Sequence, residues 1–130
     1  MILSENREDE LRKFATKIRL NTLRTLNHLG FGHYGGSLSI VEVLAVLYGE
    51  IMPMTPEIFA LRDRDYFVLS KGHAGPALYS TLYLNGFFDK EFLHSLNTNG
   101  TKLPSHPDRN LTPGIDMTTG SLGQGISVAT

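Results

Sequence analysis

Three of the five histidines lie in turns beside glycine or proline, where side chains can reach a ligand. They are His33 in Gly-His-Tyr-Gly-Gly, His73 in Ser-Lys-Gly-His-Ala and His106 in Pro-Ser-His-Pro-Asp. Imidazoles can donate hydrogen bonds to phosphate or sugar oxygens and can move protons near neutral pH. Each histidine taken alone also fits an ordinary exposed loop residue. The spacings match no short zinc-ligand motif, so a zinc site is not expected.

A second candidate is the glycine cluster at 120–125, which precedes an apolar helical run. Backbone N–H groups in such a turn can meet an anion or a polar ring. The order G-x-x-G-x-G is not a dinucleotide fingerprint, and Ile126 stands where a Walker A loop needs lysine. A tight, closely packed turn into a helix would explain the same glycines. Lys71 is expected to be solvated, and His28 and His94, within helical segments, are expected to be structural.

Composition excludes several classes of protein. The absence of cysteine excludes disulfide scaffolds, cysteine nucleophiles and thiolate metal sites. A formal net charge of −1 leaves no basic excess for a nucleic-acid partner. The sequence has no Gly-x-Ser-x-Gly elbow and no carboxylate pair placed for glycoside hydrolysis. It has neither a secretory signal pattern nor a long apolar run, so we expect no membrane partner and a cytoplasmic location.

The positioning elements are mostly helices. Apolar residues at helical spacing predict a helix over 7–29, followed by an irregular glycine-rich turn at 30–36. Ser39 and Glu42 form a predicted capping box for a second helix that buries Val41, Leu44, Ala45 and Tyr48 and is ended by Pro53 near Ile51. A third helix is predicted from Pro76 to Gly86, and Asp89 is the predicted N-cap of a short fourth helix.

The stretch 65–70 is predicted to be a strand buried on both faces, as in a parallel sheet. Residues 97–121 are predicted to form a long loop, which in a compact domain is functional or disordered. The apolar run 126–130 begins a helix with no cap or breaker, so the sequence reads as truncated. The predicted fold class is α/β, with residues 1–130 forming a single partial domain.

Four motifs in order resemble the amino-terminal region of the transketolase family across nearly the whole chain. They are 32–38 (GHYGGSL), 64–74 (RDYFVLSKGHA), 105–108 (SHPD) and 118–125 (TTGSLGQG). Two residues depart from the family pattern, since Tyr34 and Ser121 each replace a usual proline. Ser121, together with the run Gly35-Gly36-Ser37, makes the chain more similar to the amino-terminal subunit of split, two-subunit transketolases.

The resemblance implies the N-terminal, diphosphate-binding part of a thiamine-diphosphate fold, a parallel sheet flanked by helices that is helix-rich in this fragment. His73 is implied to contact the cofactor diphosphate. Gly120, Ser121 and Leu122 are implied to line the pocket of the cofactor rings. His33 and His106 are implied to bind the donor ketose and assist proton movement.

The implied activity is transfer of a two-carbon ketol unit from a ketose phosphate to an aldose phosphate. A C-terminal transketolase subunit or domain would complete a homo- or hetero-oligomer. The Mg²⁺ or Ca²⁺ ligands of the family's GDG…N motif lie beyond this chain, so the isolated 130 residues are expected to be inactive. The alternatives are an enzyme like deoxyxylulose-phosphate synthase, or an inactive fragment that serves as an interaction module.

Overall fold

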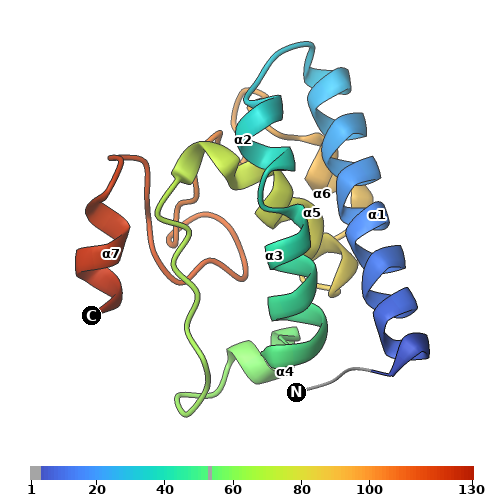
Figure 1. Ribbon diagram of the computed structural model, residues 1–130. Coiled ribbons are helices and arrows are strands. Elements are labelled where there is room, and N and C mark those ends of the chain that lie inside the picture. Colours follow the sequence, from blue (N-terminus) through green and yellow to red (C-terminus); the bar gives the residue numbers. More distant parts are fainter. Residues whose placement is uncertain (1–3, 53) are drawn as a thin grey trace.

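A computed structural model describes residues 4–52 and 54–130, and these residues form helices, turns and loops without a β-strand. Figure 1 shows the helices α1, α3 and α5 gathered together, with α7 at the opposite side of the molecule. The elements are α1 (Glu5–Leu29), α2 (Tyr34–Leu38), α3 (Val41–Val46), the π-helical turn η1 (Leu47–Ile51), α4 (Pro56–Phe59), the 3₁₀ turn η2 (Gly72–Ala74), α5 (Gly75–Leu84), α6 (Lys90–His94) and α7 (Gln124–Ala129).

Helix α1 confirms the helix predicted over 7–29 and extends it by two residues. Its first turn is capped by Ser4, whose Oγ accepts a hydrogen bond from the backbone N–H of Arg7 at 3.3 Å. It ends at Gly30, which has the left-handed φ of 85° common after a helix. Leu11, Ile18 and other apolar residues on one face of α1 are buried, so this face forms one wall of the core.

Helix α5 lies at the centre of the core, because α1, α2, α3 and α6 all pack against it. Every residue from Gly75 to Leu82 is buried. The helix begins beside Pro76, as predicted, and Gly86 follows it with a φ of 85°. The short helix predicted after Asp89 is also confirmed, since the Asp89 carboxylate accepts from the Phe92 N–H at 2.7 Å.

The predicted capping box at Ser39 and Glu42 is wrong. Ile40 is the N-cap of α3 and makes no side-chain cap. The Ser39 hydroxyl donates to the Gly36 carbonyl at 3.0 Å, while Glu42 forms an ion pair with Arg19 on α1. Ser39 also accepts a hydrogen bond from the Lys71 ammonium, so distant cations engage both side chains and neither caps α3.

The glycine-rich turn and the second helix are partly as predicted. Residues 30–33 are irregular, but α2 starts at Tyr34 and includes Gly35 and Gly36. The second helix buries the four predicted residues, Val41, Leu44, Ala45 and Tyr48, and widens into the π turn η1. Pro53, the predicted breaker, lies outside the described residues.

The stretch Tyr34–Ile51 has the length and apolar composition that a membrane-crossing helix would need. In the structure it is divided into α2, α3 and η1. Its buried side chains pack into the core beside α1 and α5. Core packing is therefore a sufficient reason for the apolar residues on its inner face.

The predicted strand at 65–70 is not formed within the part of the chain that the structure describes. These residues form no hydrogen-bonded strand pairing with another described segment. The segment is also not buried on both faces, because Tyr66 is 62% exposed. Leu69 is buried and Phe67 is partly buried against the core, so the segment touches the core through these two side chains. A strand needs a hydrogen-bonded neighbour, and the apolar run alone does not supply one.

The predicted long loop, residues 97–121, is irregular but firmly attached to the core. The Tyr79 hydroxyl on α5 donates to the Pro104 carbonyl at 2.8 Å. The Thr112 hydroxyl donates to the Lys102 carbonyl at 2.7 Å, and Leu103 and Ile115 are buried. The long loop thus holds a defined position over the start of α5.

Candidate functional site

The structure brings the three predicted histidines together from three separate elements. His33 precedes α2, His73 lies in η2 and His106 lies in the long loop. The ring centroids of His33 and His73 are 5.2 Å apart, and those of His33 and His106 are 6.2 Å apart. His33 is exposed and the other two are half-buried, so solvent and ligands can reach the cluster.

The glycines of the first motif allow this approach. A Cβ atom added at Gly36 would lie 2.5 Å from Cδ2 and 2.8 Å from Nε2 of His73, so α2 can contact the ring only because this residue has no side chain. The Lys71 ammonium donates to the Gly36 carbonyl at 3.0 Å and to the Ser39 hydroxyl at 2.6 Å. Lys71 was expected to be solvated, but its two hydrogen bonds join the turn that carries His73 to α2 and to Ser39, which follows it.

The second and fourth motifs also lie in contact. A Cβ atom at Gly72 would lie 2.9 Å from the backbone N of Gly120 and from the backbone of Thr119. The start of helix α7 packs equally closely against the second motif, since a Cβ atom at Gly125 would lie 2.6 Å from Ser70 Cα. Gly120 itself faces His106, with 3.6 Å from its Cβ position to His106 Cδ2. Gly120 therefore belongs to the histidine cluster.

The remaining predicted pocket residues, Ser121 and Leu122, follow Gly120 but lie on open surface. Leu122 is 72% exposed. Beside them, the Thr119 hydroxyl oxygen is buried and has no hydrogen-bond partner among the described residues. A buried polar atom without a partner is costly, so this hydroxyl is suited to a ligand at the Gly120 turn.

The surroundings of His73 are unfavourable for a positive charge on its ring. Burial lowers the pKa of His73, and the neighbouring His33, Lys71 and His106 lower it further. A protonated His73 would therefore face repulsion in the free protein. An anionic group bound among these side chains would relieve that repulsion, and an imidazole N–H could donate to it.

The cavity beneath the cluster is small. Its volume is about 70 Å³ and its lining includes His33, His73, Pro76 and Ser105. A larger groove of about 370 Å³ runs between α1 and α3, but it contains no histidine, and its charged residues include the Arg19–Glu42 ion pair. Residues 4–52 and 54–130 hold no group of three or more His, Asp or Glu side chains placed to bind a metal ion.

The two helical histidines lie apart from the three clustered ones and stack on each other. The ring centroids of His28 and His94 are 5.5 Å apart, and the planes are inclined by 24°. Burial lowers the pKa of His94, and the charges of Lys90, His28 and Arg24 add to this effect. These contacts agree with the structural role expected for both histidines.

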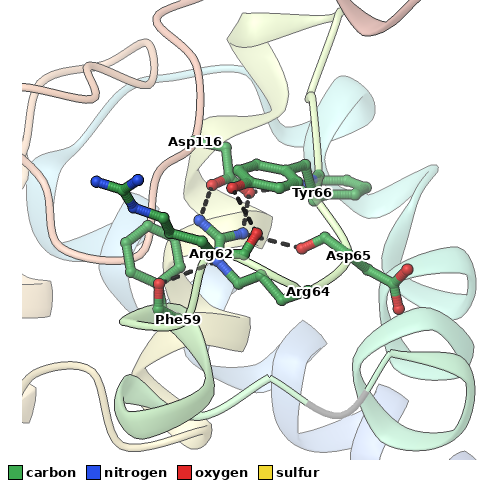
Figure 2. A network of polar contacts seen from close by, with 7 residues as sticks. Phe59, Arg62, Arg64, Asp65, Tyr66 and Asp116 are labelled. Atoms are coloured by element: carbon green, nitrogen blue, oxygen red, sulfur yellow. Dashed lines mark hydrogen bonds and ion pairs between the residues drawn. The ribbon is translucent and has the colours of Figure 1, made fainter.

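One part of the site escaped the sequence analysis. Arg64 and Asp116 form an ion pair in which Nη2 and Oδ1 lie 2.6 Å apart and the side chains are 7% and 8% exposed. Figure 2 shows this pair with the aromatic rings of Phe59 and Tyr66 beside the guanidinium. Arg64 begins the 64–74 motif, but Asp116 lies 52 residues further along the chain and outside all four motifs, so nothing in the sequence indicated their contact.

Comparison with known proteins agrees with this arrangement. Residues 11–130 match the family described as "Transketolase, thiamine diphosphate binding domain". The chain therefore belongs to this family. The solved transketolase of Leishmania mexicana superposes on it with a TM-score of 0.84 and 34% identity, over 90% of this chain and 18% of that one. The thiamine-diphosphate-binding fold is thereby confirmed, although the described residues do not include its sheet.

Two relatives are subunits of divided enzymes, as Ser121 and the Gly35-Gly36-Ser37 run predicted. The 6-deoxy-6-sulfo-D-fructose transketolase subunit SqwG of a Clostridium species is 55% identical over 98% of this chain and 46% of its own length. An apulose-4-phosphate transketolase subunit of Actinobacillus succinogenes is 36% identical over 93% of this chain and 44% of its own length. The chain thus spans less than half the length of these two relatives.

Proposed function

We propose that this chain is the amino-terminal part of a transketolase, a transferase that moves a two-carbon ketol unit from a ketose phosphate to an aldose phosphate. The observation that carries the proposal is the meeting of His33, His73 and His106 at the Gly120 turn. Membership of the thiamine-diphosphate-binding family supports it. The TTGSLGQG motif at 118–125 favours transketolase over the deoxyxylulose-phosphate synthase alternative.

The cofactor is thiamine diphosphate, which when bound supplies a nucleophilic carbon and stabilises the carbanion of the donor fragment. His73 would donate a hydrogen bond to a diphosphate oxygen. The Thr119 hydroxyl and the Gly120 backbone would face the cofactor, and Ser121 and Leu122 would lie along its rings. The buried Thr119 hydroxyl without a partner and the cationic surroundings of His73 fit an anionic ligand.

His33 and His106 would bind the substrates. Each imidazole can donate to a sugar hydroxyl and can hold a proton at a ring nitrogen while a hydroxyl becomes a carbonyl. The two relatives described above are named for sugars with an anionic substituent, a sulfonate or a phosphate. We therefore expect a donor ketose that carries such a group. Comparison of 6-deoxy-6-sulfo-D-fructose with fructose 6-phosphate as donors would identify which one.

The proposal requires further chain. A C-terminal transketolase subunit or domain would complete the site, and the ligands of a Mg²⁺ or Ca²⁺ ion on the diphosphate would come from outside these residues. Residues 65–70 would pair as a strand of the parallel sheet there. Slow amide exchange at residues 68 and 69 in the complete protein, set against fast exchange in residues 1–130 alone, would test this pairing. A cytoplasmic location remains part of the proposal.

The test uses the complete enzyme assembled with its partner subunit, with a ketose phosphate donor and an aldose phosphate acceptor. His73→Ala should raise the Kd for thiamine diphosphate by roughly ten- to a hundredfold, since a charge-assisted hydrogen bond is lost. His106→Ala should raise the donor KM or lower kcat while the cofactor Kd stays nearly unchanged. His28→Ala is the matched control, because this histidine lies outside the cluster.

Two results would count against the proposal. If the unaltered enzyme neither binds thiamine diphosphate nor transfers ketol units, the function is wrong. If His106→Ala loses the cofactor and His73→Ala loses only the donor, the roles of the two histidines are reversed.

A further inference from the structure

The Arg64–Asp116 pair forms a closed network of hydrogen bonds. Arg64 uses both Nη atoms on the carboxylate, with Nη1 lying 3.2 Å from Oδ2 and Nη2 lying 2.6 Å from Oδ1. Its Nε donates to the Phe59 carbonyl at 3.0 Å and Nη1 donates to the Asp65 carbonyl at 2.9 Å. A two-point contact of this kind fixes direction as well as distance.

Two aromatic rings restrict the guanidinium further. Its central carbon lies 4.2 Å from the ring centroid of Phe59 and 4.1 Å from that of Tyr66. In Figure 2 the guanidinium lies beside the carboxylate of Asp116, with the rings of Phe59 and Tyr66 close to it. Stacking and bidentate pairing are properties of arginine that lysine does not share.

Asp116 joins this network to the chain that leads to His73. Its Oδ2 also accepts a hydrogen bond from the backbone N–H of Phe67 at 2.9 Å. From Phe67 the chain runs on to Gly72 and His73, and from Asp116 it runs on to Thr119 and Gly120. The two stretches meet again where Gly72 touches Thr119 and Gly120. The stretches 67–72 and 116–120 are therefore attached to each other at both ends: Phe67 contacts Asp116, and Gly72 contacts Gly120.

We propose that Arg64 and Asp116 are positioning residues for cofactor binding, which set the register between the His73 turn and the Thr119–Gly120 turn. The inference rests on the proposed function and adds residues to it that do not touch the cofactor. Without the carboxylate, residues 117–120 lose their attachment to Phe67, and the two turns can shift relative to each other. A displacement of about 1 Å in a positioned group can cost a hundredfold in function.

The experiment measures thiamine diphosphate binding to the complete, assembled enzyme by titration, together with kcat at saturating cofactor and the unfolding temperature. Asp116→Asn removes the charge but keeps the shape. Arg64→Lys keeps the charge, which spares the fold, but loses the two-point contact and the stacking. Both variants should raise the cofactor Kd, by about tenfold or more for Asp116→Asn and less for Arg64→Lys, and saturating cofactor should restore most of kcat.

Two controls separate positioning from loss of stability. Leu93→Ala, a fully buried change in α6, lowers stability without touching either turn and should leave the Kd of the folded protein unchanged. Glu8→Gln removes a carboxylate from the exposed Glu8–Arg12 pair and should change nothing.

The proposal is overturned if folded Arg64→Lys and Asp116→Asn bind the cofactor like the unaltered enzyme, or if Leu93→Ala raises the Kd as much as they do. Should Asp116→Asn fail to fold, Arg64→Lys decides the question alone. Failure of the unaltered enzyme to bind thiamine diphosphate would instead refute the proposed function.

Discussion

Helix α5 and the long loop at 97–121 lie against each other but are held by different forces. Residues 75–82 of α5 are all buried, and apolar packing against α1 and α3 fixes the helix. The long loop has two buried apolar anchors, Leu103 and Ile115, and otherwise depends on directed contacts such as the Thr119 N–H to the Pro107 carbonyl at 3.1 Å. Packing determines that the region stays folded, whereas directed contacts determine where His106 and Gly120 lie.

This difference separates stability from site geometry. Apolar burial is proportional to area and is not directional, so it can tolerate small shifts. A hydrogen bond weakens steeply when its angle changes. We therefore expect substitutions in α5 to reduce stability most, and substitutions at the contacts of the long loop to disturb the site more than the fold.

The largest effect on stability is expected from Leu82→Ala. Leu82 on α5 is fully buried, and its Cδ2 would lie 2.8 Å from a Cβ atom at Gly114. The lost burial and the cavity should reduce the free energy of unfolding by about 2–5 kcal/mol, measured by urea denaturation. Leu61→Ala, at a position that is 57% exposed, is the control and should have little effect. Equal losses at the two positions would contradict the central place of α5.

The next largest loss of stability is expected from Gly72→Ala. Gly72 lies in the turn η2 just before α5, where this turn touches the long loop. The new methyl group would meet the backbone of Thr119 and Gly120 at 2.9 Å, so the two turns must separate at a cost of about 1–3 kcal/mol. Gly35→Ala is the matched control, since a Cβ atom there has nothing within 4 Å and the residue lies inside α2. Thermal unfolding of both variants would decide, and a harmless Gly72→Ala would show that the turns are loosely packed.

Tyr79→Phe is expected to have a smaller effect, since it removes only the hydroxyl that joins α5 to the long loop. The ring still fills the core, and the lost hydrogen bond to the Pro104 carbonyl should cost about 0.5–1.5 kcal/mol. Because Pro104 lies two residues before His106, we also expect a higher donor KM in the assembled enzyme. A variant with unchanged stability and unchanged KM would mean that this bond does not position the loop.

The smallest effect is a dependence of stability on pH. His73 and His94 both have a pKa below the ordinary 6.5, in each case first through burial and then through nearby cations. The unfolded chain therefore binds more protons than the folded chain just below pH 6.5, so stability falls as the pH falls through this window. His94→Gln should reduce the fall in unfolding temperature between roughly pH 7.5 and 5.5, where carboxylates stay ionised. If the unfolding temperature of the variant falls as much as that of the unaltered protein, His94 is not a source of this pH dependence.

Local signals in the sequence were sufficient for most of the helices. Periodic apolar residues predicted α1, Pro76 and Gly86 predicted the two ends of α5, and Asp89 predicted the start of α6. The short helix α4 was missed, although Thr55 before Pro56 is a recognisable start signal and the Thr55 hydroxyl does accept from the Ile58 N–H at 3.4 Å. Ser39 and Glu42 misled for the opposite reason, since distant partners overrode a local cap.

By itself, the sequence determined the family, the four motifs and the three histidines that lie in three of them, because these depend on residue identity and order along the chain. The tertiary structure alone decided that His33, His73 and His106 meet, that Gly72 touches Gly120, and that Asp116 pairs with Arg64 52 residues away. It also decided that 65–70, apolar enough for a strand, has no strand partner among the described residues. The physical reason is range: helical periodicity and caps act over a few residues, whereas ion pairs and strand pairing depend on where the packed core brings distant segments.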